Sequence, residues 1–222
     1  MVLALGIGVV TVAGFGLHAV TGRVVWASFP PLVHIHALGF LAWLGLLVVQ
    51  PFLIGRGDVR LHRLLGRFGV LLAIGMAGLG IQVTMASIAR GTVPFGFAPP
   101  MFLASNVMAL ASFAVMVVLA VILRKHTAWH RRLMISATVL LTAPAWARLL
   151  PLEQLGQATP LVLLAALSFF IIVGMARDRL AQGRIHPAWW IGLAVVVVNL
   201  VLPVPLAMTE AVVEFTARLT GA

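Results

Sequence analysis

Residues 32–67 read LVHIHALGFLAWLGLLVVQPFLIGRGDVRLHRLLGR, and this stretch decides the fold. Residues 32–54 contain no Asp, Glu, Lys or Arg. An apolar run of about 20 residues is long enough to cross the hydrocarbon core of a bilayer as a helix. Four arginines then follow within residues 55–67. The stretch therefore predicts a membrane-spanning helix that leads into a basic connection.

The rest of the chain has the same character. Hydrophobic residues make up 62% of the 222 residues, charged residues make up 9%, and the mean hydropathy is +1.14. Soluble domains usually contain about a quarter charged residues. We therefore expect an all-α, polytopic bundle of seven transmembrane helices that forms one domain, residues 1–222. The predicted spans are about 2–20, 32–54, 68–89, 101–123, 132–150, 160–176 and 188–208.

Lysine and arginine gather in every second connection between these spans. Eleven of the 15 follow the second, fourth and sixth spans: Arg56, Arg60, Arg63, Arg67, Arg124, Lys125, Arg131, Arg132, Arg177, Arg179 and Arg184. The other four are Arg23, Arg90, Arg148 and Arg218. Short cytoplasmic loops carry the excess of positive charge, so we expect the amino terminus inside and the carboxyl terminus outside. The expected location is the bacterial inner membrane, crossed several times.

The same placement explains the net charge of +10 by membrane topology. The lipid bilayer is therefore an expected partner, and nucleic acid is not.

A weak internal repeat lies within this order. Pro30 and Pro99 open two descending spans and are 69 residues apart. His62 and His130 open the return spans and are 68 residues apart. A looser third copy covers residues 159–187. The pattern predicts one leading helix followed by three similar, parallel hairpins.

Several kinds of chemistry are excluded by missing residues. The sequence has no cysteine, which excludes disulfides and thiolate metal sites. The acidic residues are all expected in loops or in the tail: Asp58, Glu153, Asp178, Glu210 and Glu214. Without an acid at membrane depth, we expect no Ser-His-Asp arrangement and no carboxylate pair for a metal ion. Walker and dinucleotide glycine patterns are also missing.

Histidines beside the basic connections form the first candidate site. His62, His126 and His130 are the candidate cofactor ligands here, and His126 and His130 share a helix face at i, i+4. The candidate contacts for an anionic headgroup are Arg63, Arg67, Arg131 and Arg132. Three interpretations stay open: contacts with lipid phosphate, a basic pocket for an anionic ligand, and axial ligation of haem b. Haem ligation needs imidazoles from facing helices.

A polar stripe runs along the second predicted span. His36, Gly39, Trp43 and Gln50 follow one another at +3, +7 and +14, which puts them on one helix face. We expect this face to contact other helices, because polar groups in hydrocarbon need partners. His36 is the fourth candidate cofactor ligand. It lies at the opposite end of the hairpin from His62, so the two could serve two haems but not one.

Polar residues at outer or middle depth form the second candidate site. The predicted ligand pocket consists of His34, Gln50, Gln82, Asn106 and Arg148. A charge at this depth must reach water, a carboxylate or an anionic ligand, and Glu153 is near enough in sequence to pair with Arg148. Two interpretations stay open: hydrogen bonds between helices with a snorkelling arginine, or an outward-facing cavity that holds a ligand.

These motifs resemble a family of predicted bacterial multi-span membrane proteins of unknown function. The family pairs an HRxLGR-type motif, here at residues 62–67, with an HRRxM…R helix, here at residues 130–134 and Arg148. The resemblance covers about residues 32–150 and implies a multi-span membrane protein without an established activity. A fainter similarity to cytochrome b561-like proteins rests on the histidines at helix ends and implies haem b.

Three functional hypotheses follow. The first is an inner-membrane redox or accessory subunit associated with haem b or with quinone, working with another membrane subunit. The second is a non-enzymatic binding, transport or assembly protein with an outer polar pocket. The third is a membrane enzyme that acts on a lipid-soluble substrate and uses His62 or His130 as a general base.

Overall fold

The computed structural model describes residues 1–221, except for the side chains of Phe95 and Glu153. Across these residues every regular element is a helix, which confirms the expected all-α class. The α-helices are α1 (Val2–Val20), α2 (Pro31–Gly55), α3 (Val59–Ala89), α4 (Pro99–Ile122), α5 (Thr127–Leu140), α6 (Ala143–Leu149), α7 (Leu152–Leu155), α8 (Thr159–Gln182), α9 (Pro187–Val201), α10 (Pro203–Ala207) and α11 (Glu210–Thr220). Short 3₁₀ helices lie at Trp26–Ser28, Pro94–Gly96, Leu123–Lys125 and Gly156–Ala158.

Six helical segments of the described chain are long and apolar enough to cross a membrane. They are Val2–Val20, Pro31–Gly55, Val59–Ala89, Pro99–Lys125, Gly156–Gln182 and Pro187–Ala207. Each of the six overlaps one of the predicted spans. The chain is therefore a helical bundle of the kind that multi-pass membrane proteins form.

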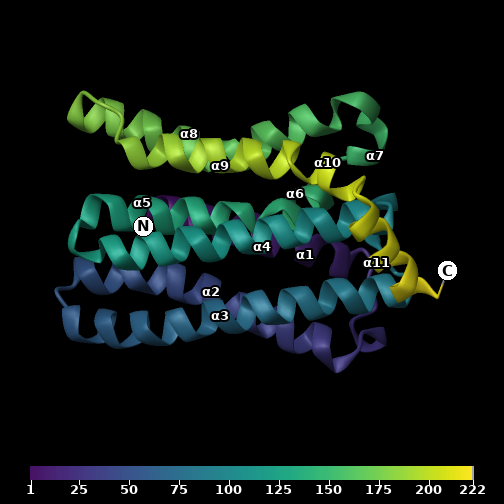
Figure 1. Cartoon of the computed structure of the whole chain (residues 1–222). Helices are drawn as coiled ribbons and strands as arrows, with labels where there is room; N and C mark the ends of the chain where they lie inside the picture. The colour runs from purple at the N-terminus through teal and green to yellow at the C-terminus, as the bar shows by residue number, and fades with distance from the viewer. Residues whose placement is uncertain (222) are drawn as a thin grey trace.

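After α1 the chain forms three antiparallel hairpins, α2–α3, α4–α5 and α8–α9 (Figure 1). The turns of all three hairpins lie at one end of the bundle, on the left in Figure 1. We call it the basic end, because eleven of the 15 Lys and Arg residues lie in these turns or in the neighbouring helix turns. The first residue lies there as well, since its amine feels the charges of Arg131 and Arg177. This arrangement matches the expected plan of one leading helix and three hairpins.

Prolines start several of the long helices. Pro31, Pro99 and Pro187 are the first residues of α2, α4 and α9. At this position the missing N–H removes a donor that has no partner within the helix. α3 starts instead with a side-chain cap, because Asp58 Oδ1 accepts a hydrogen bond from the Leu61 N–H at 3.0 Å.

Two helices extend further into the basic end than predicted. α3 begins at Val59, where the predicted span began at 68, and α8 continues to Gln182, where the predicted span ended at 176. Hydropathy marks the depth of a residue in the bilayer, whereas Arg, Gln and Asp are tolerated in a helix that projects beyond it. The HRxLGR motif lies in the first turns of α3, at the start of the return helix as expected. Asp178 lies on α8, so the prediction that it belongs to a loop was wrong.

The fifth predicted span, 132–150, is not one continuous helix. α5 ends at Leu140 and α6 starts at Ala143, with a turn at residues 141–142. Pro144 has no backbone N–H and cannot continue the hydrogen bonding of α5. The Thr142 hydroxyl closes the turn by donating to the Val139 carbonyl at 2.7 Å. The last predicted span is broken in the same way, between α9 and α10, where Pro203 starts the second helix.

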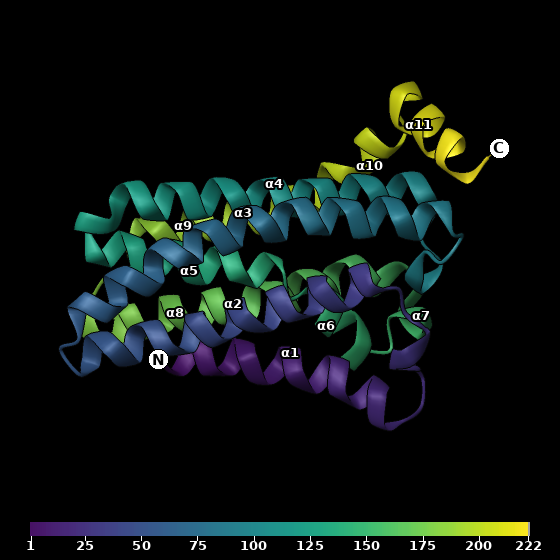
Figure 2. The same cartoon turned by 90° about the horizontal axis from the view of Figure 1, so that it is seen from below.

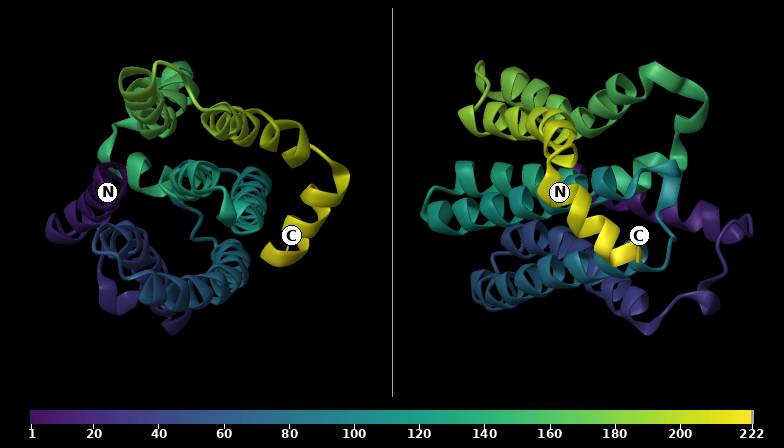
Figure 3. Two further views of the ribbon diagram at one scale, coloured as in Figure 1. Left: turned by 90° about the vertical axis from the view of Figure 1, so that its left-hand side faces the viewer. Right: turned by 45° about the vertical axis from the view of Figure 1, so that its right-hand side comes forward.

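α5 lies at the centre of the bundle, between α4, α8 and α9 (Figure 3, left). Its buried residues are Arg132, Leu133, Ser136, Ala137, Thr138, Val139 and Leu140. A helix enclosed by other helices contacts little lipid, so it can carry hydroxyl groups and a charge. Trp43 of α2 is also buried against it and donates from Nε1 to Thr138 Oγ1 at 3.1 Å.

The carboxyl-terminal helix α11 lies outside the hairpin arrangement. It crosses α3 and α4 near the end of the bundle that is opposite the basic end (Figure 2). Arg218 and Glu214 form an exposed ion pair at 3.0 Å on this helix.

Candidate functional site

Two histidines lie at the basic end of the bundle. His62 is the fourth residue of α3 and His130 is the fourth residue of α5, so the two occupy equivalent positions in their helices. Both side chains are half-buried. The two imidazoles are close enough to feel one another electrostatically, and the backbone of Gln50 faces His62. α2, α3 and α5 therefore place these groups at the same end of the bundle.

The hydrogen bond of His130 fixes which nitrogen is free. Nδ1 lies 2.8 Å from the Ala120 carbonyl oxygen. A carbonyl oxygen can only accept, so Nδ1 carries the proton and donates it. In the neutral ring Nε2 is then left with an exposed lone pair. Ligating histidines typically have this arrangement, in which a backbone carbonyl orients the ring.

His62 and Gln50 add polar groups without partners to the same place. Among the described residues, neither His62 Nδ1 nor Gln50 Oε1 has a hydrogen-bond partner, although both atoms are buried. The amide nitrogen of Gln50 lies 3.6 Å from the position that a Cβ on Gly66 would take, which places the side chain against the HRxLGR motif. Buried polar atoms normally have a partner, so this cluster is suited to hold a polar ligand or water.

The other inner residues lie around this pair. His126 is exposed and is the residue that precedes α5. Arg63, Arg67 and Arg131 are also exposed, so they remain candidate contacts for an anionic headgroup. Among the side chains that the structure describes, which exclude Glu153, no group of three or more His, Cys, Asp or Glu is close enough to hold a metal ion.

Arg132 has a different role from the one predicted. Its side chain is 2% exposed and forms a bidentate ion pair with Asp178 of α8, with distances of 2.8 Å from Nε and 2.6 Å from Nη2. Nη1 donates to the Ala128 carbonyl at 2.8 Å. The prediction that Arg132 contacts an anionic headgroup was wrong, because its guanidinium is buried and is already bound by the carboxylate of Asp178.

Asp178 is a central residue that the sequence analysis had placed in a loop. Besides Arg132, it accepts from Trp189 Nε1 at 2.8 Å and from the backbone N–H of His186 at 3.4 Å. It is 7% exposed. A helical signal could have found it: Ile171, Gly174 and Asp178 follow at +3 and +7 and are all buried. The stripe was missed because the predicted span ended two residues earlier.

His186 lies beside this ion pair, at the start of α9. Its Nδ1 accepts from the Ala188 N–H at 3.2 Å, and its ring packs edge-on against Trp129 with centroids 4.9 Å apart. Burial, followed by the positive charge of Arg132, lowers the pKa of His186 below its ordinary value. The imidazole is therefore neutral at neutral pH.

The polar stripe of α2 faces the other helices, as expected. Trp43 packs edge-on against Phe113 of α4 with centroids 5.1 Å apart. A Cβ on Gly39 would lie 3.7 Å from Met76 of α3. His36 is half-buried near the opposite end of α2, and its Nδ1 has no partner among the described residues. His36 and His62 therefore lie at opposite ends of the α2–α3 hairpin, as predicted.

One residue of the predicted outer pocket lies at the other end of the bundle. Gln50 lies at the basic end beside His62, because the 14 residues from His36 cover about 21 Å along a helix. Gln50 was therefore assigned to the wrong site. Gln82 is exposed on α3. Asn106 of α4 donates to the Phe102 carbonyl at 2.8 Å.

Arg148 lies on α6 and packs against α1. Its guanidinium lies 4.3 Å from the centre of the Phe15 ring, and Nη1 donates to the Pro144 carbonyl at 2.7 Å. The predicted pairing with Glu153 falls on a side chain outside the described residues. His34 is half-buried in the first turn of α2. A shared pocket for His34, Asn106 and Arg148 thus stays a prediction.

Comparison with known proteins adds no further assignment. No protein-family model, curated protein or solved structure matches this chain. The resemblance carried by the HRxLGR and HRRxM motifs therefore stays an expectation, and the function must be argued from the site at the basic end.

Proposed function

We propose that this chain is a multi-pass inner-membrane protein that serves as a haem- or quinone-associated redox or accessory subunit. Its working site is the His62–His130 pair at the basic end. The observation that carries the proposal is that two half-buried imidazoles from two helices lie within electrostatic range of each other at one end of the bundle, and one of them has its Nδ1 held by a backbone carbonyl. The bilayer and a second membrane subunit are its expected partners.

The donor set is suited to haem b. Imidazole is a common ligand of haem iron, and His130 would offer a free Nε2 on an oriented ring. His62 of α3 lies within electrostatic range of His130, and its buried Nδ1 has no partner in the described structure. When bound, this group supplies one-electron chemistry, while His62 and His130 would hold and orient it. His36 could serve only a second site, at the other end of the hairpin.

A quinone is the other redox ligand that these side chains suit. Gln50 Oε1 and His62 Nδ1 are buried without partners in the described structure and can accept hydrogen bonds from the hydroxyl groups of a quinol. The pair lies near the end of the apolar helices, where a lipid-soluble ring can enter from the bilayer.

The absorption spectrum of the purified protein tests the proposal. For the haem form, we expect a Soret band that is lost in His130→Gln and in His62→Gln, because glutamine cannot replace an axial imidazole. His126→Gln is the matched control: it changes an exposed histidine one turn from His130 and should keep the band. Solvent extraction of the same preparations measures bound quinone.

A folded preparation that contains neither haem nor quinone would overturn the proposal. So would a haem or quinone content that is the same in His130→Gln, His62→Gln and wild type. Circular dichroism of each variant shows that the fold is intact before the two measurements are compared.

We also propose that the basic end faces the cytoplasm, which puts the amino terminus inside and the carboxyl terminus outside. Eleven of the 15 Lys and Arg residues lie at this end, and cytoplasmic loops carry such an excess. Counting α5 and α6 as one interrupted crossing gives the seven spans that this orientation requires.

Cysteine labelling tests the orientation directly, because the sequence has no cysteine of its own. We expect Thr92→Cys to react with a membrane-impermeant maleimide added to whole spheroplasts, and Arg60→Cys to react only after the cells are opened. Both positions are exposed, and they lie at opposite ends of α3. The reverse pattern, or labelling of both positions from outside, would contradict the proposed topology.

A further inference from the structure

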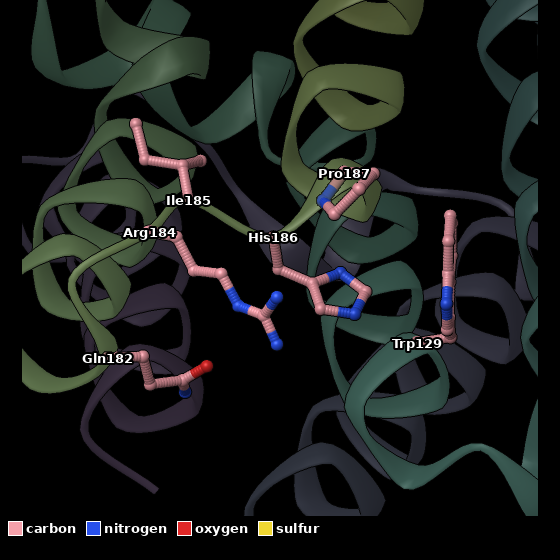
Figure 4. A pocket seen from close by; sticks show the side chains of 6 residues that line it. All are labelled: Trp129, Gln182, Arg184, Ile185, His186 and Pro187. Atoms are coloured by element: carbon pink, nitrogen blue, oxygen red, sulfur yellow. The ribbon is translucent and has the colours of Figure 1, made fainter.

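A cavity of about 360 Å³ lies at the basic end, where α8 turns into α9. Its lining residues are Trp129, Gln182, Arg184, Ile185, His186 and Pro187. Figure 4 shows the guanidinium of Arg184 and the ring of His186 on the same side of the turn, with Trp129 beyond the imidazole. α5 supplies Trp129, and the α8–α9 turn supplies Arg184 and His186. The cavity is separate from the His62–His130 pair and from the function proposed for that pair.

The hydrogen bond of His186 fixes which of its ring nitrogens can donate. Its Nδ1 accepts from the Ala188 N–H, so in the neutral ring the proton is on Nε2. His130 has the opposite arrangement, because there Nδ1 donates to a carbonyl. His186 therefore offers an N–H that an anion can use, whereas His130 offers a lone pair.

The charges around the cavity favour an anion. The charged groups that act on His186 are Arg132, Asp178, Arg131 and Arg184. Three of these are positive, and the carboxylate of Asp178 is bound by Arg132, Trp189 and the backbone N–H of His186. The negative charge of Asp178 is thus balanced by its own partners. The positive charges of Arg184 and Arg131 therefore remain to attract an anion to the cavity.

The apolar part of the lining is suited to an amphiphile. Ile185, Pro187 and the ring of Trp129 border the cavity. On the two helices that this turn joins, Leu180 is 87% exposed and Trp190 is 55% exposed. Exposed apolar side chains beside a basic group at the end of a membrane bundle are typical of sites for anionic lipid headgroups.

We propose that this cavity binds a phosphate group. The guanidinium of Arg184 is the charged donor and His186 Nε2–H is the second donor. The phosphate can come from the headgroup of an anionic lipid or from a free phosphate ion, which share this chemistry. The planar guanidinium of arginine is suited to grip two phosphate oxygens at once. The neutral Gln182 can supplement these donors from the end of α8.

Titration calorimetry of the protein in a neutral detergent tests the site. The probes are dihexanoylphosphatidylglycerol and inorganic phosphate, with dihexanoylphosphatidylcholine as the probe without net charge. We expect Arg184→Gln to weaken binding of the preferred anionic probe by about tenfold or more, because a charge-assisted bidentate contact is lost. Arg60→Gln removes the same charge from an exposed position of the same end and should change the affinity by less than about twofold.

His186→Asn tests the second donor. An asparagine can still cap α9 through its Oδ1, so the helix start is kept while the Nε2–H is removed. We expect this variant to weaken binding by several-fold. Tighter binding of the lipid probe would assign the phosphate to a headgroup, and equal or tighter binding of inorganic phosphate would assign it to the free ion.

Two results would overturn the proposal. One is an equal loss of affinity in Arg184→Gln and Arg60→Gln, which would mean diffuse attraction to the whole basic end. The other is equal binding of phosphatidylcholine and phosphatidylglycerol by the wild type, with no measurable binding of inorganic phosphate. Neither result depends on haem or quinone content, so this experiment and the test of the redox function are independent of each other.

Discussion

Replacing Arg132 with methionine is expected to lower the free energy of unfolding by about 3–5 kcal/mol, because it leaves the Asp178 carboxylate buried without its counter-charge. Both guanidinium contacts, at 2.8 and 2.6 Å, disappear together. The remaining donors to Asp178 are the indole of Trp189 and the backbone of His186, and neither carries a full positive charge. The three helices that meet here, α5, α8 and α9, should loosen at the basic end.

The double variant Arg132→Met, Asp178→Asn separates a charge effect from a packing effect. Asparagine keeps an oxygen that can accept from Trp189 Nε1 and removes the buried charge. We expect it to regain most of the stability lost in Arg132→Met, since replacing both partners of a buried pair is often close to neutral. Equilibrium unfolding in mixed micelles of dodecyl maltoside and dodecyl sulfate measures both values.

A loss below about 1 kcal/mol in Arg132→Met would contradict this account, because it would mean that water reaches Asp178 readily. A double variant no more stable than Arg132→Met would contradict it too. In that case the methionine side chain, rather than the unpaired carboxylate, would be the source of the loss.

Much of the fold could be predicted because lipid constrains the sequence strongly. α1 has the bounds expected for residues 2–20, and α2 and α4 differ from the predicted spans by two residues or fewer at each end. The charged ends could not be predicted in this way. α3 begins at Val59 inside a stretch with four arginines, because a helix projects out of the bilayer without losing its hydrogen bonds.

The central position of α5 could not be inferred from hydropathy. Arg132, Ser136 and Thr138 make this segment the least apolar of the long helices, a property that also fits a helix near the surface. Its polar groups are satisfied by neighbours from distant parts of the chain, such as Trp43 and Asp178. One sequence does not show which helix the others enclose.

The two candidate sites differ in how far they could be predicted. His62 and His130 were identified from motifs with matching positions, and the fold places both at equivalent points of the helices. The cavity at His186 was not identified, because a turn and a tryptophan more than 50 residues away form it together. The spacing of residues along one helix does not show which residues of other helices will lie beside them.

Gly14→Ala is expected to destabilise the protein by about 3 kcal/mol, although alanine is the better helix former. A Cβ at Gly14 would lie 2.5 Å from the Ala145 carbonyl oxygen and 3.0 Å from its Cα. These are backbone atoms of α6, and they cannot turn aside as a flexible side chain would. α1 packs chiefly on α6, so the two helices would have to separate along their whole contact.

Gly16→Ala is the matched control, because it makes the same change two residues later in the same helix. No atom lies within 4 Å of the Cβ position at Gly16. There the substitution should be neutral or stabilise the helix by up to about 1 kcal/mol. Opposite signs at Gly14 and Gly16, measured by unfolding in mixed micelles, would establish that α1 is held by close approach of its backbone to α6. Equal changes in stability, of either sign, would show that helix propensity determines the effect at both positions and that α1 does not pack against Ala145.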